Sequence, residues 1–245
     1  VAVIAVDGDQ MGRWVSGAKT PRLREQLAKE AVEYYDGLYE EAIAGKRDDR
    51  ARRIAQFLEI PRPLSPSYHA QFSEALSNFG MYLVQPIVEE LCDGQVIYAG
   101  GDDVLAMVPA TEAFRCAELL RSAFRGEESL AEVASARGGD PLFDVPFAGF
   151  VRLLPGSDRS GSLPTWPLVV PGPRADVSAG IAIAHMHSPL QAMVAAAWAA
   201  ERRAKTQYGR AAFAVSILKR SGEIHEWGAK WDSQALRLME HIRNT

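Results

Sequence analysis

Residues 95–108 read QVIYAGGDDVLAMV. Two apolar runs flank a glycine pair in this stretch, with Asp102 and Asp103 directly after the glycines. A tight hairpin turn needs backbone with positive φ, which glycine adopts without strain. The stretch therefore predicts a β-hairpin with two carboxylates at its turn.

A second apolar run, VAVIAV, opens the chain and ends at Asp7. A short, β-branched run of this kind is typical of a strand buried on both faces, and it delivers an acid at its carboxyl end. The chain starts at Val1 without an initiator Met, and we interpret it as a piece of a longer multidomain protein.

The rest of the chain supplies helices and further strands. Apolar residues recur at helical spacing in five segments, which are 23–44, 67–91, 111–124, 189–207 and 231–242. Further strands are expected at 177–184 and 213–218. Residues 46–66 and 127–176 are rich in charged residues, proline or glycine, and we expect exposed insertions there, the second with a strand at 147–154.

This order of elements is that of the split βαβ, ferredoxin-like arrangement. We therefore predict an α+β fold, a ferredoxin-like palm with a central antiparallel sheet, helices on one face, insertions and a C-terminal helix. Residues 1–245 are expected to form a single domain of this type.

Composition narrows the class of protein. Hydrophobic residues make up 47% of the chain and charged residues 24%, which is ordinary for a globular protein. No apolar run approaches the roughly 18 residues that cross a bilayer, and no signal peptide opens the chain, so we expect a cytoplasmic location without a membrane partner. The net charge of −4 restricts nucleic-acid contact to local patches. Cys92 and Cys116 are expected to be buried free thiols.

The acidic residues carry the functional prediction. Asp7 and Asp9 flank Gly8 at the end of the first strand, and a ferredoxin-like sheet places this end beside the hairpin turn with Asp102 and Asp103. Four neighbouring carboxylates repel one another unless divalent cations such as Mg²⁺ or Mn²⁺ neutralise them. Two metals about 4 Å apart activate an attacking hydroxyl and stabilise a leaving pyrophosphate. We therefore predict a two-metal site formed by these four acids.

Glycines next to the acids fit the same prediction. Gly8, Gly100 and Gly101 would let triphosphate oxygens approach the backbone closely. The alternative is that the Asp-Gly and Gly-Asp pairs are ordinary turns, in which Asp bonds to its own backbone. Two such motifs, each at the end of an apolar strand, favour the metal site.

Five segments resemble the large, polymerase-like subunit of type III CRISPR effector complexes, and the III-B form fits best. They are VDGDQMG (6–12), IYAGGDDVL (97–105), SAGIAIAH (178–185), SPL (188–190) and LKRSG (218–222). The resemblance covers nearly the whole chain except 46–66 and 127–176, and it implies a second palm domain, which bears the catalytic hairpin.

In that family the palm pair converts ATP into cyclic oligoadenylate, a second messenger, when target RNA is bound. The resemblance thus implies a nucleotidyltransferase with ATP as substrate and with Asp7, Asp102 and Asp103 as catalytic acids. It implies as partners the other subunits of the complex, the first palm domain of the same subunit and, indirectly, guide and target RNA. The sequence has no His-Asp doublet for the HD nuclease site of the family.

Two alternatives stay open. In the first, the palm is a catalytically silent, nucleotide-binding scaffold of the ribonucleoprotein. In the second, it is a template-dependent polymerase. Intact acidic motifs argue against the first, and the lack of an extended basic groove argues against the second.

A wider resemblance links the chain to GGDEF diguanylate cyclases. Ala204-Lys205 followed by Gly209-Arg210 is similar to a segment of that family with one extra residue, which implies that Lys205 contacts the triphosphate. A solvated helix residue is the alternative for Lys205. The hairpin ends in Asp-Asp rather than Glu-Phe, and QMGRW follows Asp9, so diguanylate synthesis is not expected.

Several other polar and aromatic residues are open to two interpretations. His185 and His187 are expected to be structural or surface residues, and Lys219 and Arg220 either contact phosphate or form a solvated pair. The five tryptophans are expected to pack in the interior. They are Trp14, Trp166, Trp198, Trp227 and Trp231.

Overall fold

The computed structural model describes residues 1–45, 49–131, 141–154 and 166–234. The chain divides into two compact units. We call Gln10–Ala70 the helical unit, and Val1–Asp9 together with Gln71–Thr245 the palm unit.

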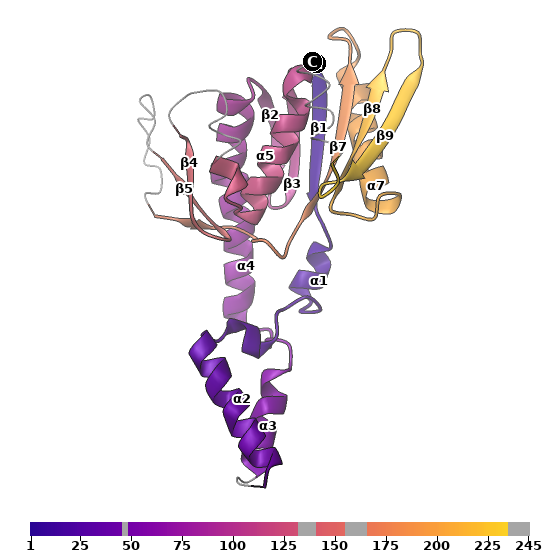
Figure 1. Ribbon diagram of the computed structural model, residues 1–245. Helices are drawn as coiled ribbons and strands as arrows, with labels where there is room; N and C mark the ends of the chain where they lie inside the picture. The colour runs from indigo at the N-terminus through magenta and orange to yellow at the C-terminus, as the bar shows by residue number, and fades with distance from the viewer. Residues whose placement is uncertain (46–48, 132–140, 155–165, 235–245) are drawn as a thin grey trace. The chain divides into compact units, whose positions relative to one another are not determined.

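The palm unit is built on a six-stranded sheet with the strand order β2-β3-β1-β7-β8-β9 (Figure 1). The strands are β1 (Ala2–Gly8), β2 (Gln95–Gly100), β3 (Asp103–Val108), β7 (Val177–Ala184), β8 (Ala212–Leu218) and β9 (Ile224–Lys230). The first four in the order pair antiparallel, as in a ferredoxin-like split βαβ unit. The predicted α+β, ferredoxin-like palm is therefore confirmed. Strands β7 and β8 pair parallel, so the complete sheet is mixed rather than antiparallel throughout.

Helices connect these strands in the expected order. Helix α4 (Pro66–Asn78) continues into two π-helical segments, Phe79–Leu83 and Pro86–Leu91, before β2. A short 3₁₀ turn (Ala110–Glu112) and helix α5 (Ala113–Arg125) follow β3. Helix α7 (Leu190–Thr206) joins β7 to β8.

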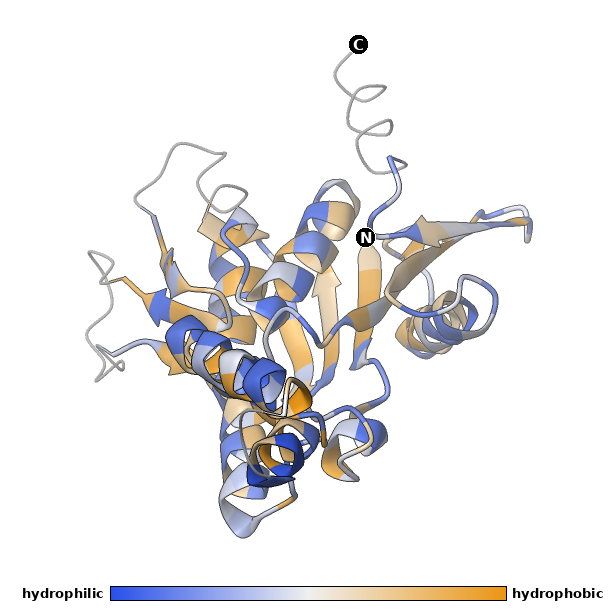
Figure 2. Ribbon diagram, turned by 60° about the horizontal axis from the view of Figure 1, so that its bottom comes forward, coloured by the Kyte–Doolittle hydropathy of each residue, from blue (hydrophilic) through white to orange (hydrophobic). Residues whose placement is uncertain are grey.

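Strand β1 is buried on both faces, as its continuous apolar sequence predicts. Residues 2–6 are each at most 3% exposed. Figure 2 shows hydrophobic colouring along the central strands of this sheet. Helix α5 covers one face, where the ring of its Phe124 packs 5.1 Å from the ring of Phe79. Helix α7 covers the other face. The predicted placement of the helices on one face therefore holds only for the ferredoxin-like part of the sheet.

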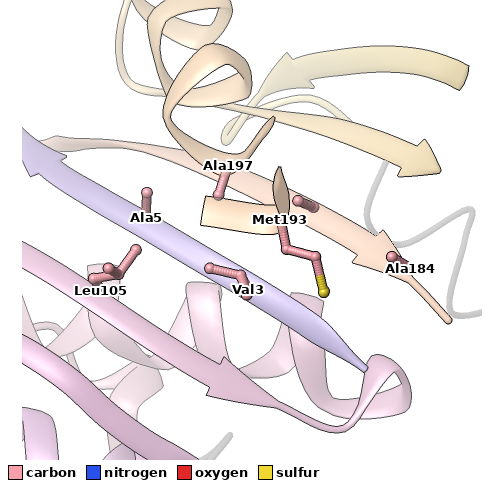
Figure 3. Close-up of a cluster of buried hydrophobic side chains, with 7 residues drawn as sticks. Val3, Ala5, Leu105, Ala184, Met193 and Ala197 are labelled. Carbon is pink, nitrogen blue, oxygen red and sulfur yellow. The ribbon is translucent and has the colours of Figure 1, made fainter. Parts of the chain in front are cut away.

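Helix α7 lies unusually close to the sheet. Met193 and Ala197 pack against Val3 and Ala5 of β1 (Figure 3). At Gly180 of β7, a Cβ atom would lie 2.1 Å from the carbonyl oxygen of Ala197. Glycine on the strand and alanine on the helix are therefore what allow this approach.

A second, three-stranded sheet occupies part of the predicted 127–176 insertion. It consists of β4 (Phe143–Phe147), β5 (Phe150–Leu153) and β6 (Leu168–Val169). The sequence predicted one strand here, and the structure forms three. The side-chain amide of Asn78 donates to the carbonyl of Val169 over 2.9 Å and so fixes this sheet to the end of α4.

The helical unit holds α1 (Met11–Val15), a 3₁₀ turn (Leu23–Gln26), α2 (Lys29–Ile43) and α3 (Asp49–Leu58). Residues 23–44 were predicted as one helix, but Leu27 and Ala28 are extended, so α2 starts only at Lys29. The predicted excursion at 46–66 contains α3. Its apolar residues Ala51, Ile54, Ala55 and Leu58 recur at helical spacing, so the sequence carried a helical signal that the charged and proline-rich composition of the whole segment obscured.

Ion pairs hold the helical unit together. Glu59 pairs with Arg22 and, over 2.6 Å, with Arg24, whose guanidinium also reaches Asp36 at 2.9 Å. The C-terminal helix predicted over 231–242 lies mostly outside the described residues, and residues 231–234 form a turn. Among the described residues, no helix combines the length and apolar character needed to cross a membrane.

Candidate active site

A cavity of about 390 Å³ opens on the α7 side of the palm sheet. Strands β1, β2 and β3 and helix α7 line it, all from the palm unit. Its charged lining residues are Asp7, Asp103, Glu201 and Arg202, and its aromatic ones are Tyr98 and Trp198.

The strand register explains why these side chains meet. Residues directly opposite one another in a sheet point to the same face. We call the first set of such residues the acidic row, which comprises Gly100, Asp103, Asp7 and Ser178. We call the second set the apolar row, which comprises Tyr98, Leu105, Ala5 and Gly180. The rows are two residues apart along each strand, or roughly 7 Å.

Asp7 and Asp103 therefore share one face, as the sequence predicted from the ferredoxin-like topology. Helix α7 adds a third carboxylate, Glu201, and the ammonium of Lys205. Lys205 pairs with Asp7 and lies 2.7 Å from Oε1 of Glu201, which accepts no well-directed hydrogen bond from the described residues. Lys205 thus occupies the position between two acids where a cation is needed.

Burial perturbs the titration of this cluster. Burial, helped by the charges of Asp9 and Asp103, raises the pKa of Glu201 to about 7. Burial also lowers the pKa of Lys205 to about 8 and raises the pKa of Asp102 and of Asp103. Each shift favours the neutral form, because burial takes these groups partly out of contact with water. Shifts of this kind gather at functional sites.

Asp9 is placed differently from Asp7. Its carboxylate is 4% exposed and is not part of the cavity lining. The hydroxyl of Ser178 donates to both carboxylate oxygens, over 2.8 and 3.0 Å, and the backbone N–H of Ala211 donates over 2.6 Å. We call this arrangement the Asp9 nest. These hydrogen bonds fasten β1 to the start of β8, and the place of Asp9 among the metal ligands stays a prediction.

A run of left-handed backbone completes the nest. Gly209, Arg210 and Ala211 have φ values of 72°, 64° and 42°. Arg210 and Ala211 carry side chains, for which this conformation is unfavourable. The hydrogen bond from Ala211 to Asp9 is one of several that hold this segment, since Lys230 donates to the carbonyl of Gly209 over 2.7 Å and Trp231 donates to the carbonyl of Ala211 over 3.2 Å.

The hairpin forms as predicted, with Gly101 at φ +65°. Asp102 sits in its turn, half-buried and outside the cavity lining. A Cβ on Gly100 would lie 2.3 Å from the hydroxyl of Tyr98, and one on Gly80 would lie 3.3 Å from the backbone N of Gly101. A side chain at Gly100 would therefore displace the Tyr98 ring, and one at Gly80 would press on the hairpin backbone. Gly80 belongs to the first π-helical segment, a feature often found at functional sites.

The donor set suits a hard divalent cation. Asp7, Asp103 and Glu201 offer carboxylate oxygens, which Mg²⁺ and Mn²⁺ prefer. Within the described part of the chain, no three His, Cys, Asp or Glu side chains are already grouped closely enough to hold a metal. Gly8 lies at the end of β1 opposite Val177 and does not line the cavity.

Four charged or aromatic residues of the cavity lining were not predicted from the sequence, and three of them lie on α7. Trp198, Glu201 and Arg202 precede Lys205 by seven, four and three residues, and so share its helix face. This periodicity was the available signal for them. Trp198 was expected to pack in the interior, but it is 55% exposed. Tyr98, the fourth, is two residues before Gly100 and points to the same face.

The histidines and basic residues near the β7–α7 loop form a separate cluster. His185 contacts the guanidinium of Arg220, with 2.7 Å between the nearest nitrogen atoms, and its ring lies 5.1 Å from that of His187. Lys219 pairs with Glu223 over 2.9 Å. None of these residues lines the cavity.

The strand order and the acids at the end of β1 and at the hairpin together define a palm domain. Residues 1–136, more than half of the chain, match the family described as Cas10/Cmr2, second palm domain. The chain belongs to this family.

Individual relatives agree with this assignment. The CRISPR system Cmr subunit Cmr2 of Pyrococcus furiosus is 28% identical over 237 residues, which cover 94% of this chain and 20% of the relative. The CRISPR system CMR subunit Cmr2 of Saccharolobus solfataricus is 32% identical over 127 residues, covering 52% of this chain and 10% of the relative. The chain therefore spans about a fifth of the length of the Pyrococcus relative.

Solved structures show the same fold. A chain of the type III-B Cmr-beta complex in its apo state superposes with a TM-score of 0.54 at 19% identity, covering 94% of this chain and 25% of the other. A chain of the Cmr-beta complex bound to cognate target RNA gives 0.51 at 18% identity, covering 92% and 27%.

Proposed function

We propose that this palm domain is a metal-dependent nucleotidyltransferase that joins ATP molecules into cyclic oligoadenylate within a type III CRISPR effector complex. One observation carries the proposal: Asp7 and Asp103 face a single cavity, together with Glu201 and with Lys205 as the neutralising cation. Membership of the Cas10/Cmr2 second palm family supports it.

Asp7 and Asp103 are the proposed metal ligands, with Asp102 adjacent in the hairpin turn. A bound Mg²⁺ or Mn²⁺ pair would supply charge neutralisation and activation of the attacking hydroxyl. Lys205 would exchange its pairing with Asp7 for contact with the triphosphate. Gly101, where a side chain would meet no atom within 4 Å, would leave the hairpin backbone open to phosphate oxygens, and Gly100 would do the same once the Tyr98 hydroxyl turns aside.

The proposed reaction joins two nucleotides. The 3′-hydroxyl oxygen of one ATP bonds to the α-phosphorus of the next, the bond from that phosphorus to the β-phosphate oxygen breaks, and pyrophosphate leaves. The hydroxyl proton passes to solvent. Because no protein nucleophile takes part, the residues of the chain contribute positioning and electrostatic stabilisation.

The wider assembly is part of the proposal. The relatives named above are Cmr2 subunits, and the superposed chains come from type III-B complexes, one with target RNA. We infer that this domain works with other subunits of such a complex, with a first palm domain of the same subunit and, indirectly, with guide and target RNA in the cytoplasm.

A silent nucleotide-binding scaffold is the second candidate. The pairing of Asp7 with Lys205 favours it, because this ion pair already neutralises one acid of the site. Turnover separates the two candidates. The chain is incubated with ATP and Mn²⁺, alone and with the other subunits, and the products are resolved by mass.

Cyclic oligoadenylate made by the assembled complex supports the proposal. Its loss in Asp103→Asn, and its persistence in Asp232→Asn, locates the activity in this cavity. Asp232 is a suitable control because its side chain is 87% exposed and does not line the cavity. ATP bound by the complex without any product would favour the scaffold.

A further inference from the structure

Two large aromatic side chains stand exposed at the cavity. Tyr98 and Trp198 are each 55% exposed, and both line it. One comes from β2 and the other from α7, so the aromatic groups border the cavity from two different elements. An interior packing role accounts for neither of them at this exposure.

The ring of Tyr98 lies along the sheet. A Cβ on Gly100, two residues further along β2, would be 2.3 Å from the Tyr98 hydroxyl and 2.8 Å from the ring carbon that bears it. The missing side chain at Gly100 is therefore what lets the ring extend from the apolar row toward the acidic row. In this position the ring borders the cavity over its length.

The part of the cavity lining next to this ring is apolar. Leu105 and Ala5 occupy the apolar row, and Ala197 of α7 packs against the same cluster (Figure 3). Leu105 and Ala5 also line the cavity. The cavity thus has an apolar, aromatic part roughly 7 Å along the strands from its carboxylates.

The charged and apolar parts match the two ends of a nucleotide. Cation-neutralised carboxylates suit phosphate groups, and an apolar pocket with aromatic walls suits a flat heterocycle. Arg202, one helical turn from Trp198, adds a positive charge to the lining.

We propose that Tyr98 and Trp198 form a stacking seat for the nucleobase of the nucleotide whose phosphates lie at Asp7 and Asp103. This inference rests on the proposed function and adds the residues that bind the base. Stacking uses the π-face, which every base has, so the seat provides affinity and does not distinguish adenine from guanine.

The test is a set of binding measurements by calorimetry on the 245-residue chain with Mg²⁺. The probes are ATP, GTP and inorganic tripolyphosphate, and the variants are Tyr98→Leu and Trp198→Leu. Each substitution is expected to weaken ATP and GTP by the same factor, roughly 10-fold, and to leave tripolyphosphate unchanged. Both side chains are exposed, so the variants are expected to fold, which circular dichroism verifies.

Matched controls come from aromatic residues outside the cavity lining. Trp166 is 66% exposed and Tyr34 is 63% exposed, so Trp166→Leu and Tyr34→Leu repeat the same chemical changes elsewhere. Both are expected to bind ATP as the unmodified chain does. Quenching of tryptophan fluorescence by ATP is expected to disappear in Trp198→Leu and to persist in Trp166→Leu.

Three outcomes overturn the stacking seat. Unchanged ATP affinity in both cavity variants removes it while leaving the acidic site intact. Equal losses for ATP and tripolyphosphate mean that the substitutions damage the phosphate site instead. If the unmodified chain binds neither ATP nor tripolyphosphate, the proposed function of the cavity fails first, and the seat fails with it.

Discussion

Asp7 and Asp9 are two residues apart on the same strand end, yet their surroundings have little in common. Asp7 faces a cavity and pairs with the ammonium of Lys205. Asp9 is buried and accepts hydrogen bonds from the Ser178 hydroxyl and the Ala211 backbone N–H, with the guanidinium of Arg210 at 3.5 Å. Asp7 is therefore neutralised by a side-chain cation that a metal ion can replace, whereas Asp9 is also bonded to the fold through a backbone N–H and a buried hydroxyl. The comparison predicts that Asp7 serves the proposed metal site and that Asp9 contributes more to stability.

The largest expected effect is the difference in turnover rate between the isolated chain and the assembled complex. Among the described residues, the proposed site is one acidic cavity that would hold one triphosphate, while joining two nucleotides also requires a surface for the attacking ribose. We expect the isolated chain to bind one ATP and to turn over slowly or not at all. Positioning two substrates contributes on the order of 7–11 kcal/mol, so adding the first palm domain and the target-bound complex should raise the rate by many powers of ten.

Product mass and rate, measured for the chain and for the complex, check this expectation. Equal rates would contradict it and would mean that two copies of the chain build both sites. Sedimentation with ATP and Mg²⁺ detects such a dimer directly.

The second-largest expected effect comes from replacing the two hairpin acids, Asp102 and Asp103. We expect Asp102→Ala combined with Asp103→Ala to lower oligoadenylate synthesis by about 10³-fold or more, because charge stabilisation of the reacting phosphate is lost. The metal-free variant should also unfold at a higher denaturant concentration, since burial raises the pKa of both carboxyl groups and so disfavours their charged forms. Full activity in a folded double variant would remove the catalytic assignment.

The comparison between the two acids is tested most directly by stability. Asp9→Ala leaves the buried hydroxyl of Ser178 and the N–H of Ala211 without their acceptor, at about 1–3 kcal/mol for each group. Burial also raises the pKa of Asp9, so removal of its charge offsets part of this cost, and urea unfolding should show a net loss smaller than the sum of the two. Asp7→Ala removes a carboxylate whose partner Lys205 retains Glu201, and it should leave the unfolding free energy nearly unchanged. Equal losses in the two variants would erase the distinction.

The sequence predicted the elements whose signals are local. The apolar run before Asp7 and the glycine pair before Asp102 each specify a strand or turn without outside help, and the ferredoxin-like order then brings Asp7 and Asp103 together. Glu201 and Trp198 could not be placed in this way. Their role depends on α7 crossing the sheet at Gly180, a contact between segments that only the folded chain reveals.

The same limit explains why the Asp9 nest was not predicted. Asp9 repeats the local pattern of Asp7, and its donors lie about 170 and 200 residues away along the chain, at Ser178 and Ala211. Strands β4 and β6 were missed for a different reason, whereas β5 (Phe150–Leu153) lies within the strand predicted at 147–154. They are short and separated by proline and glycine, which weakens any alternating pattern.

The smallest effect concerns the backbone of the Asp9 nest. Ala211 has φ 42°, a left-handed conformation that costs an alanine about 1–2 kcal/mol and a glycine little. Glycine keeps the N–H that donates to Asp9, but it loses about 0.5–1 kcal/mol through the greater freedom of the unfolded chain. Ala211→Gly should therefore stabilise the protein by about 0.5–1 kcal/mol in urea unfolding.

The neighbouring residue provides the control for this prediction. Ala212 is fully buried in β8 and is not among the residues with positive φ, so Ala212→Gly should destabilise the protein. If the bond to Asp9 is what holds residue 211 in its strained conformation, the gain from Ala211→Gly should shrink when Asp9→Ala is also present. A double-mutant cycle measures this coupling. A gain of the same size in both backgrounds would show that Asp9 does not maintain the strain, and the nest would then be a consequence of the turn rather than its cause.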